Sequence, residues 1–375
     1  MTTPMSVLRG RAPVSRRLPD FPWDTLLGAK ERAAAHPGGI VDLSVGTPVD
    51  PVDPLIREAL AAASGFPGYP TTIGTVEVRR AAIDALKRRH GIDGLDLSMI
   101  LPVIGTKEAI AGLPSTLGLG AGDQVVIPEV AYPTYEVGAL LAGADVLRAD
   151  SLTQIGPATP AMIYLNSPSN PTGKVLPVEH LRKVVSWARE RGTLVVSDEC
   201  YLGLAWDDEP VSILDPRVTD GDNSGLLAVH SLSKTSNLAS YRAGFLAGDP
   251  ALISELLAVR KHAGMIVPFP IQAAMSAALG DDGHAAEQRE RYRLRRETLR
   301  AAVTAAGFRI DESAAGLYLW ATRDEPCRDT VAWLAERGIL AAPGDFYGPR
   351  GVRHVRMALT ATDERIAEAA SRLAS

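Results

Sequence analysis

Short apolar runs alternate with amphipathic helical stretches along most of the chain from about residue 98 onward. The runs are rich in valine, isoleucine and leucine, which is typical of strands buried on both faces of a parallel sheet. We predict such strands at residues 100–104, 124–128, 145–148, 162–165, 194–197, 227–230 and 244–247. Because helical stretches separate most of the runs, the pattern indicates an α/β fold, with a largely parallel sheet and helices on both of its faces.

The pattern changes toward the C-terminus, where a long helical stretch at residues 284–306 leaves the sheet region. It predicts a smaller α+β unit with strands at residues 308–310, 316–321 and 352–358, a helix at residues 330–337 and a last helix from Asp363. The N-terminal part predicts an arm and helix at residues 18–39, a strand at 41–45, and helices at 54–63 and 77–90. A chain of 375 residues exceeds what one compact core usually holds, so two domains are expected.

Composition and charge narrow the choice of partners and compartment. A net charge of −5 argues against a nucleic-acid partner, which usually needs a basic face, and the densest basic cluster, at residues 289–300, predicts the solvated face of a helix. Neither a secretory apolar run near the N-terminus nor a window long enough to cross a bilayer is found, so we expect no membrane and a cytoplasmic location. Two cysteines, Cys200 and Cys327, and no HExxH pattern predict neither a disulfide framework nor a metal site.

Candidate chemistry begins at Lys234, within the segment His230-Ser-Leu-Ser-Lys-Thr-Ser-Asn-Leu-Ala-Ser-Tyr-Arg242. A lysine flanked by hydroxyl groups can hold an aldehyde cofactor that carries a phosphate. The amine would bind the aldehyde carbon, and Ser231, Ser233 and Arg242 would donate hydrogen bonds to the phosphate. Taken alone, the segment is more typical of a solvated lysine in a serine-rich turn.

A second group of residues favours the cofactor interpretation. The apolar run that ends at Asp198 predicts a buried strand that delivers a carboxylate at its C-terminal end, where open α/β sheets bind their ligands. Asp198 can pair with a protonated pyridine nitrogen, while Asn170 and Tyr201 can each reach a phenolate oxygen on the same ring. Strand alternation predicts that Cys200 turns away from the side that Asp198 and Tyr201 share. The combined set describes a site for pyridoxal 5′-phosphate (PLP).

With these residues identified, the chain resembles the class I and II PLP-dependent aminotransferases of fold type I over nearly its whole length. Six motifs occur in the order and spacing of that family: Gly105-Thr-Lys-Glu-Ala, Ala131-Tyr132-Pro-Thr-Tyr, Asn170-Pro-Thr-Gly, Asp198-Glu-Cys-Tyr201, Ser231-Leu-Ser-Lys234 with Arg242, and Val355-Arg356-Met-Ala-Leu. The resemblance implies a large PLP-binding domain at residues 46–284. It also implies a small domain that joins residues 1–45 to residues 285–375.

The resemblance also implies roles for the individual residues. Lys234 would be joined to the cofactor and, once displaced by substrate, would move a proton at the reacting carbon, with Asp198 and Tyr201 as the other catalytic residues. Arg356 would bind the substrate α-carboxylate as a bidentate fork, beneath the backbone at Gly46. The remaining cofactor contacts would be the backbone N–H groups of Gly105, Thr106 and Lys107 at the phosphate, Tyr132 stacked on the ring, and Tyr69 from the neighbouring subunit. The last of these implies a homodimer with shared active sites.

Within the family, the stretches Leu18-Pro-Asp-Phe-Pro-Trp-Asp-Thr-Leu and Asp42-Leu-Ser-Val-Gly-Thr-Pro-Val-Asp-Pro are similar to the actinobacterial type of N-succinyldiaminopimelate aminotransferase. This similarity implies transfer of an amino group between N-succinyl-LL-2,6-diaminopimelate and 2-oxoglutarate, in lysine and diaminopimelate biosynthesis. Such a substrate has distant carboxylates, for which Arg260-Lys261-His262, or Arg350 with Arg353, are candidate cations. A solvated helix end explains each of these groups equally well.

Two other interpretations stay open. The first is a different enzyme of the same fold, either a broad aspartate, alanine or aromatic aminotransferase or a PLP-dependent β-lyase, because these enzymes use the same lysine, aspartate and phosphate contacts. The second is a regulatory module that binds PLP without turnover. It is disfavoured because every catalytic position of the family is filled in this sequence.

Overall fold

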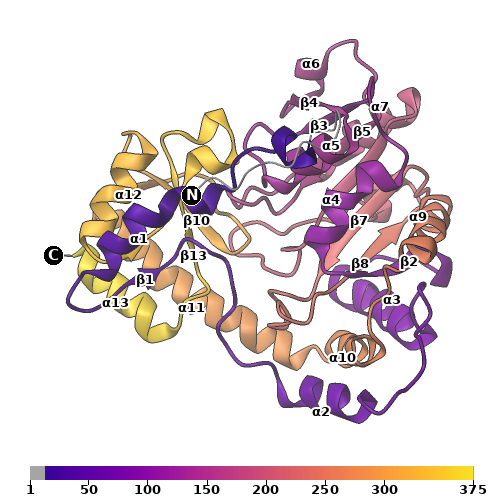
Figure 1. Ribbon diagram of the computed structural model, residues 1–375, viewed down its shortest axis with the longest axis horizontal. Coiled ribbons are helices and arrows are strands. Elements are labelled where there is room, and N and C mark those ends of the chain that lie inside the picture. Colours follow the sequence, from indigo (N-terminus) through magenta and orange to yellow (C-terminus); the bar gives the residue numbers. More distant parts are fainter. Residues whose placement is uncertain (1–12, 375) are drawn as a thin grey trace.

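The computed structural model describes residues 13–374 and has two lobes joined by the long helix α11 (Gly283–Ala305) (Figure 1). The large lobe is built on a seven-stranded sheet, and the small lobe on a four-stranded sheet with the first and last helices of the chain beside it. Within residues 13–374, no helix combines the length and apolarity that crossing a bilayer requires. The domain boundaries at residues 46–284, 1–45 and 285–375 stay predictions.

The large sheet has the predicted, mostly parallel arrangement. Its strands, in spatial order, are β2 (Ile100–Ile104), β8 (Ala243–Gly248), β7 (Leu226–Ser231), β6 (Leu194–Asp198), β5 (Met162–Asn166), β3 (Gln124–Ile127) and β4 (Asp145–Arg148). β8 runs antiparallel to its neighbours β2 and β7, whereas the strands from β7 to β4 pair in parallel. The C-terminal ends of β5, β6 and β7 therefore meet at one edge of the sheet.

Helices cover both faces of this sheet because its central strands are apolar on both sides. One apolar core includes residues of α4 (Thr106–Thr116), α5 (Thr134–Ala142) and α9 (Pro250–Ala263). The core on the other face includes residues of α2 (Pro54–Ala63), α3 (Val76–His90), α7 (Val178–Arg191), α8 (Pro216–Thr219) and α10 (Phe269–Gly280). A short helix, α6 (Leu152–Ile155), and the 3₁₀ turn η3 (Leu97–Met99) complete the lobe.

The small lobe has its own apolar core, around β10 (Tyr318–Thr322) and β13 (Val355–Ala358). These strands pair antiparallel, with β9 (Arg309–Ile310) and β12 (Ala342–Pro343) at the two edges. The helices α1 (Leu27–Ala34), α12 (Cys327–Glu336) and α13 (Asp363–Leu373) belong to this lobe, as do β1 (Val41–Asp42) and β11 (Ile339–Leu340), which pair in parallel. The 3₁₀ turns of this lobe are η2 (Pro22–Leu26), η4 (Gly344–Tyr347) and η5 (Pro349–Gly351), whereas η1 (Val14–Arg17) lies against α5 of the large lobe.

Two expectations about these elements were wrong. The strand predicted at residues 41–45 is only two residues long, because the backbone from Ser44 onward leaves β1 to bond side chains of the candidate site. The basic cluster on α11 is not a uniformly solvated face. Arg295 is 3 % exposed and bonded to Asp50 and Asp363, and Arg296 is 6 % exposed and paired with Asp207. These arginines thus fasten neighbouring segments to the helix that joins the lobes.

Candidate active site

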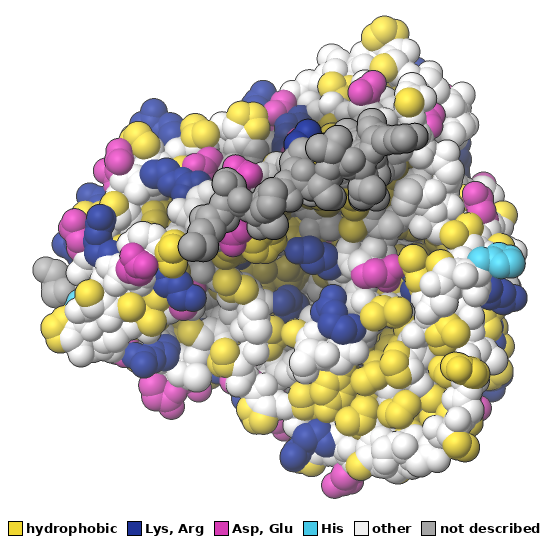
Figure 2. Space-filling view, viewed as in Figure 1, with side chains coloured by type: hydrophobic (Ala, Val, Ile, Leu, Met, Phe, Trp, Pro, Cys, Tyr) yellow, Lys and Arg dark blue, Asp and Glu magenta, His cyan; other side chains and the backbone are white. Residues whose placement is uncertain are grey.

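The candidate site lies at the C-terminal ends of β5, β6 and β7, which end at Asn166, Asp198 and Ser231. The loop from β7 to β8 brings Lys234 to the same edge, where it meets the N-terminal segment at Gly46. Figure 2 shows the molecular surface hollowed between the two lobes, with basic side chains inside the hollow. Residues from separate motifs therefore meet where a parallel sheet is expected to bind its ligand.

Asp198 is the buried carboxylate of the site. Its Oδ2 accepts a hydrogen bond of 2.7 Å from the Tyr135 hydroxyl, and its Oδ1 accepts one of 3.1 Å from the backbone N–H of Cys200. Burial raises the pKa of Asp198, while these two donors act in the opposite direction. A cationic partner such as a pyridinium N–H would compensate the cost of keeping this group charged. Tyr135 is itself fully buried and stacked on Tyr164, so the carboxylate is held in one orientation.

Lys234 reaches across to the N-terminal segment. Its Nζ donates a hydrogen bond to the backbone carbonyl of Gly46, and burial lowers the pKa of this amine below its usual value. A lowered pKa increases the fraction of neutral amine, which is the form that attacks an aldehyde and accepts a proton. The predicted approach of Gly46 to the site is therefore present. A Cβ added at Gly46 would lie 2.3 Å from the Tyr318 hydroxyl, so only glycine leaves room here.

A cradle for an anion lies at the N-terminus of α4. Gly105 precedes the helix with φ +74°, and a Cβ at this position would lie 2.2 Å from Nη2 of Arg242. The backbone N–H groups of Thr106 and Lys107 belong to the first helical turn, where they have no partner within the helix. Arg242 has a positive φ of 55°, a conformation that non-glycine residues adopt mainly where their surroundings enforce it. Helix N-terminus and guanidinium together suit a phosphate.

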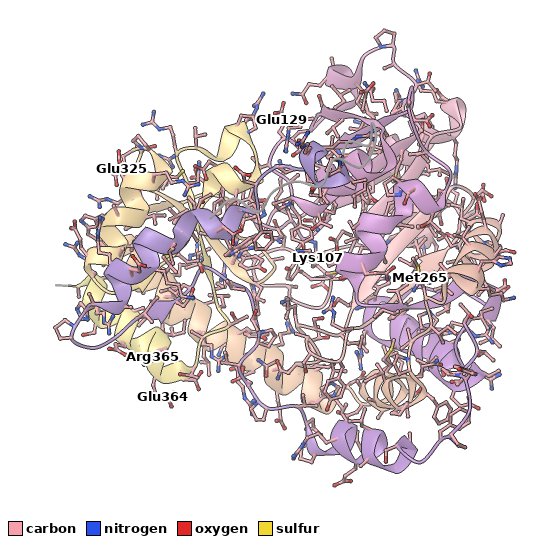
Figure 3. All side chains as sticks on the ribbon, viewed as in Figure 1. Lys107, Glu129, Met265, Glu325, Glu364 and Arg365 are labelled. Carbon is pink, nitrogen blue, oxygen red and sulfur yellow. The ribbon has the colours of Figure 1, made fainter. Side chains whose placement is uncertain are left out.

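Other predicted residues border this cradle less directly. Ser231 is half-buried and its Oγ accepts the backbone N–H of Ser233 at 3.1 Å, while Ser233 is buried. The side chain of Lys107 is exposed, lies in the hollow between the lobes (Figure 3) and contacts the ring of Phe21 at 5.6 Å. Its pKa is lowered by partial burial and by the positive charge of Arg242. Lys107 thus offers a cation at the mouth of the hollow in addition to its backbone N–H.

Arg356 is buried, and part of its guanidinium group lacks a hydrogen-bond partner. Its Nη1 donates to Asn170 Oδ1 at 2.9 Å and its Nη2 to the carbonyl of Ser44 at 2.7 Å. The guanidinium lies over the ring of Tyr318 at 4.0 Å, and its buried Nε has no hydrogen-bond partner among residues 13–374. Since Asn170 uses its oxygen for Arg356, its amide nitrogen is the group that can donate to a ligand. Such a guanidinium suits a carboxylate bound as a bidentate pair.

Tyr318 was not predicted from the sequence, although it contacts three of the predicted residues. Its hydroxyl lies 2.9 Å from the Tyr201 hydroxyl, and its ring lies against both Arg356 and the position of Gly46. Burial raises the pKa of Tyr201 well above its usual value, so its hydroxyl stays a donor at neutral pH. The only available signal was strand alternation on β10, which places Tyr318 two residues before the buried Trp320.

Cys200 does not turn away as predicted. β6 ends at Asp198, and Cys200 lies in the following turn, where strand alternation no longer applies. Its Sγ lies 3.5 Å from the Thr106 hydroxyl, between the cradle on α4 and the carboxylate of Asp198. Tyr132 lies nearby, edge-on to Tyr135 with ring centroids 5.7 Å apart. Cys200 and Tyr132 therefore both belong to the wall of the site.

Three of the candidate cations for a distant substrate carboxylate have other partners within the chain. Arg260 is 4 % exposed and pairs with Glu108 on α4 at 3.4 Å, whereas Lys261 and His262 beside it are exposed. Arg353 donates to the backbone carbonyl of Asp324 instead of facing the site, and Arg350 pairs with Glu129 at 3.3 Å. A role of the Arg260-Lys261-His262 segment at the site of a neighbouring subunit stays a prediction.

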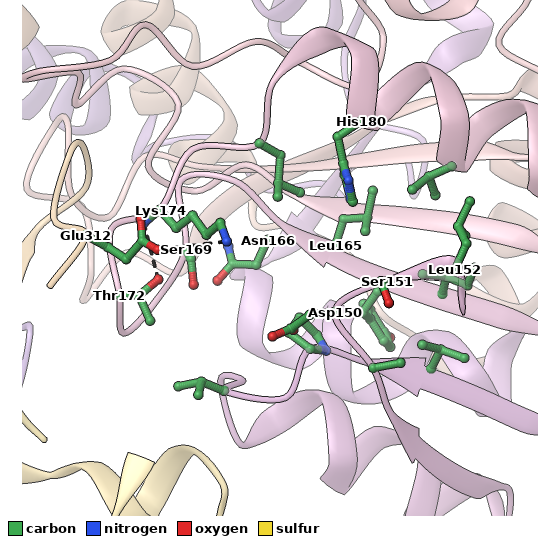
Figure 4. Close-up of a pocket in the computed structure, with 18 of the residues that line it drawn as sticks. Asp150, Ser151, Leu152, Leu165, Asn166, Ser169, Thr172, Lys174, His180 and Glu312 are labelled. Carbon is green, nitrogen blue, oxygen red and sulfur yellow. Dashed lines mark hydrogen bonds and ion pairs between the residues drawn. The ribbon is translucent and has the colours of Figure 1, made fainter. Parts of the chain in front are cut away.

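A separate cavity of about 310 Å³ lies beside the site, between the sheet edge and the small lobe (Figure 4). Its wall includes Asn166 at the end of β5 and Trp320 on β10, and its rim carries Asp150 and an ion pair of 3.8 Å between Lys174 and Glu312. None of the predicted cofactor or substrate residues that the structure describes lines it. The cavity is thus distinct from the hollow that holds Lys234.

Comparison with known proteins decides the family. The family model "Aminotransferase class I and II" matches residues 39–373. The chain belongs to this family. Its members use PLP, and the residues described above fit that cofactor: a buried acceptor for the ring nitrogen, an amine of lowered pKa, and a cradle beside Arg242 that a Cβ would fill. The chain is therefore a PLP-dependent aminotransferase of fold type I.

Individual relatives agree with this assignment. This aminotransferase is 69 % identical over 363 residues to a probable aminotransferase, Rv1178, of Mycobacterium tuberculosis, covering 97 % of this chain and 87 % of the relative. It is 57 % identical over 358 residues to the 4-dedimethylamino-4-oxo-anhydrotetracycline transaminase OxyQ of Streptomyces rimosus, covering 96 % and 99 %. Among solved structures, a probable N-succinyldiaminopimelate aminotransferase from Thermus thermophilus aligns with a TM-score of 0.85 at 27 % identity, covering 94 % and 99 %.

Proposed function

We propose that this aminotransferase transfers an amino group between N-succinyl-LL-2,6-diaminopimelate and 2-oxoglutarate, in lysine and diaminopimelate biosynthesis. The observation that carries the proposal is the pairing of one buried guanidinium, Arg356, with a hollow whose mouth carries a further exposed cation, Lys107. Arg356 suits the α-carboxylate, and Lys107 suits a carboxylate farther along the same substrate. The likeness to the probable N-succinyldiaminopimelate aminotransferase of Thermus thermophilus supports the same substrate.

The proposed roles of the residues follow from their contacts. PLP supplies an aldehyde for the substrate amine and a ring that accepts electrons from Cα. Asp198, fixed by Tyr135, would keep the ring nitrogen protonated, while the Asn170 amide, whose oxygen is held by Arg356, and the Tyr201 hydroxyl, which lies beside Tyr318, would donate to the ring oxygen. Lys234 would supply the amine that holds a proton at Cα of the substrate and passes it to the cofactor side. Burial lowers the pKa of this amine, which favours the neutral form that can accept a proton.

The proposal is tested by a half-reaction followed in the visible spectrum. The holoenzyme is mixed with N-succinyl-LL-2,6-diaminopimelate, glutamate, aspartate, alanine and phenylalanine in separate experiments, and loss of the lysine-bound cofactor band is timed. We expect the succinylated substrate and glutamate to react at least about tenfold faster than alanine and phenylalanine, since these two lack a second carboxylate for the hollow. A faster reaction with alanine or phenylalanine would contradict the substrate assignment, and release of ammonia without 2-oxoglutarate would indicate a lyase.

A second candidate substrate class is a polycyclic ketone. The likeness to OxyQ, named for a 4-oxo-anhydrotetracycline substrate, extends over nearly the full length of both chains. An acceptor of that kind has no α-carboxylate for Arg356. Its kcat/KM would therefore be far less sensitive to Arg356→Lys than the kcat/KM for 2-oxoglutarate. Comparing the two acceptors in this variant separates the two candidates.

We also propose that the enzyme is a homodimer with shared active sites. The predicted partner contact, Tyr69, is 97 % exposed, and apolar side chains gather on the surface near α2 and α10 (Figure 2): Leu55, Phe66 and Val76 are each more than 40 % exposed. Exposed apolar patches of this kind are typical of subunit interfaces. The exposure of Tyr69 in a single chain fits a side chain that acts in the neighbouring site.

Mixed dimers test this arrangement. Lys234→Ala and Tyr69→Ala are each expected to be nearly inactive alone, but a hybrid dimer would contain one site with both native side chains. Random mixing after dissociation should therefore restore about a quarter of the wild-type activity per subunit. Lys234→Ala mixed with Asp198→Ala is the control. Both of these residues act in the site of their own chain, so every site of that hybrid keeps one lesion and no recovery is expected. Equal recovery in both mixtures would refute the role of Tyr69 in the neighbouring site.

A further inference from the structure

A cavity of about 350 Å³ lies on the opposite face of the large sheet from Asp198. Glu199 follows Asp198 directly, and strand geometry sends the two side chains to opposite faces. The cavity is lined by Glu199, by His230 at the end of β7, and by residues of α3, α10 and α11. The segment that carries Lys234 also contributes to its wall, through Ser231, Leu232 and Thr235, and Cys200 borders both the cavity and the candidate site. The cavity therefore lies directly behind the candidate active site.

Two buried polar side chains face one another in this cavity. Glu199 is 2 % exposed and His230 6 % exposed, and Glu199 Oε2 lies 3.7 Å from His230 Nε2. Neither of these atoms has a hydrogen-bond partner among the described residues. The other oxygen of Glu199 accepts the backbone N–H of Ile213 at 2.7 Å, and the His230 ring is stacked on Phe245. Both side chains are thus fixed in place while their facing atoms remain unsatisfied.

One proton satisfies both atoms. A protonated Glu199 is a donor at Oε2, and a neutral His230 with its hydrogen on Nδ1 is an acceptor at Nε2. Closing the gap to a hydrogen bond requires a movement of about 1 Å. If the proton crosses to His230, an ion pair results and the net charge is unchanged. Only loss of the proton to water in the cavity leaves a negative charge.

The surroundings favour the uncharged pair. Burial raises the pKa of Glu199 to about 7, although hydrogen bonds from the Ile213 backbone and from the side chains of Ser212 and Ser197 act in the opposite direction. Burial also lowers the pKa of His230 to about 3, so the proton resides on Glu199. The charge of Asp198 acts in the same direction on Glu199, and His90 on α3 further disfavours a charged His230. Other charged groups also line the cavity. They are Arg88 and Arg89 on α3, Asp282 at the N-cap of α11, Arg289 on α11, and Glu209 in the loop between β6 and α8.

We propose that Glu199 and His230 are positioning residues for the cofactor site, which hold one shared proton and thereby keep the group behind Asp198 uncharged while Asp198 itself is ionised. When this proton is lost, a second carboxylate becomes charged next to Asp198, on the strand end that holds the cofactor. Repulsion between the two carboxylates then disfavours the ionised form of Asp198 that the ring nitrogen needs, so the binding of PLP weakens. The inference rests on the proposed role of Asp198 at the ring nitrogen.

The first test uses the protein without cofactor. The pKa of Glu199 is higher in the folded protein, about 7, than the value of 4.5 for the unfolded chain. Its contribution to the free energy of unfolding is therefore fully present below pH 4.5 and is lost as the pH rises through about 7. Glu199→Gln mimics the protonated acid and does not titrate. Its melting temperature should therefore match that of the wild type near pH 4.5 and exceed it by about 3 °C or more at pH 8. Glu209→Gln removes an exposed carboxylate from the mouth of the same cavity and should show no such divergence.

The second test measures the dissociation constant of PLP between pH 6 and 9. Between pH 6 and 9 the dissociation constant of the wild type should increase by roughly threefold or more, whereas that of Glu199→Gln should not show this increase. The dissociation constant of Glu209→Gln should change with pH as the wild type does. Identical profiles for wild type and Glu199→Gln would overturn the proposal. If Glu199→Gln does not fold, infrared spectra of the wild type decide, because the proposal requires a protonated carboxyl band from labelled glutamate at pH 6 that disappears by pH 9.

Failure of the underlying role of Asp198 has a different signature. An Asp198→Asn variant that binds PLP with unchanged affinity and spectrum would refute that role, whereas the melting and infrared results on Glu199 would stand. Conversely, a loss of PLP binding in Asp198→Asn together with pH-independent behaviour at Glu199 would refute only the shared proton.

Discussion

Replacing Lys234 with alanine is expected to lower the rate of transamination by about 10⁴-fold or more. The amine is the proposed site of covalent attachment and the group that moves the proton at Cα, and among the described residues only Lys234 brings an amine to the carbonyl of Gly46. The variant should also lose the visible band of the lysine-bound cofactor. Steady-state rates and borohydride labelling followed by peptide mapping measure both effects.

Lys107→Ala is the matched control for this experiment. Lys107 is the other lysine near the cradle, with an exposed side chain at the mouth of the hollow. Its removal should leave the cofactor band and borohydride labelling at Lys234 intact, because the backbone N–H at position 107 is unchanged. Labelling of Lys107 in the wild type, or a normal visible band in Lys234→Ala, would remove the basis of the proposed site.

Arg356→Lys is expected to reduce kcat/KM for substrates with an α-carboxylate by about 100-fold or more, or about 2.7 kcal/mol. The guanidinium is buried, and its hydrogen bonds to Asn170 and Ser44 hold it above the ring of Tyr318. Lysine keeps the charge but cannot present two parallel N–H groups to a carboxylate. The loss should appear mainly in KM, since the carboxylate is bound in the substrate and the transition state alike.

Arg353→Lys tests whether this effect is specific. Arg353 lies three residues earlier, is exposed, and donates to the backbone carbonyl of Asp324, away from Arg356. Its replacement should leave kcat/KM within about twofold of the wild type. Melting temperature and cofactor content must be measured for both variants, and a fall in kcat/KM that merely follows a loss of bound PLP would argue against a role of Arg356 in binding substrate.

Much of the fold could be predicted because its signals are local. A buried strand in a parallel sheet is a short, nearly continuous apolar run, and the ends of β5, β6 and β7 were predicted within a residue or two. The site residues that follow these strands, such as Asp198 and Lys234, were recognisable because the end of a strand fixes where the next side chains lie.

The rest of the site depends on contacts between distant parts of the chain. Tyr318 meets Tyr201 across 117 residues, and Asn170 meets Arg356 across 186, and neither pairing has a local pattern. Cys200 was placed on the wrong side because alternation was extended one turn beyond the end of β6. The burial of two arginines of α11 has no signal in the sequence, because composition does not reveal which acidic residues, here Asp50, Asp207 and Asp363, fold back onto a helix.

The way Arg356 is held has a consequence for how such enzymes diversify. Its fixed partners are a main-chain carbonyl at Ser44, the Asn170 amide and an aromatic ring, all at the floor of the hollow, whereas Phe21 and Lys107 lie at its mouth. Mutations at the entrance can therefore change which molecules the enzyme accepts while recognition of the amino-acid end is inherited intact.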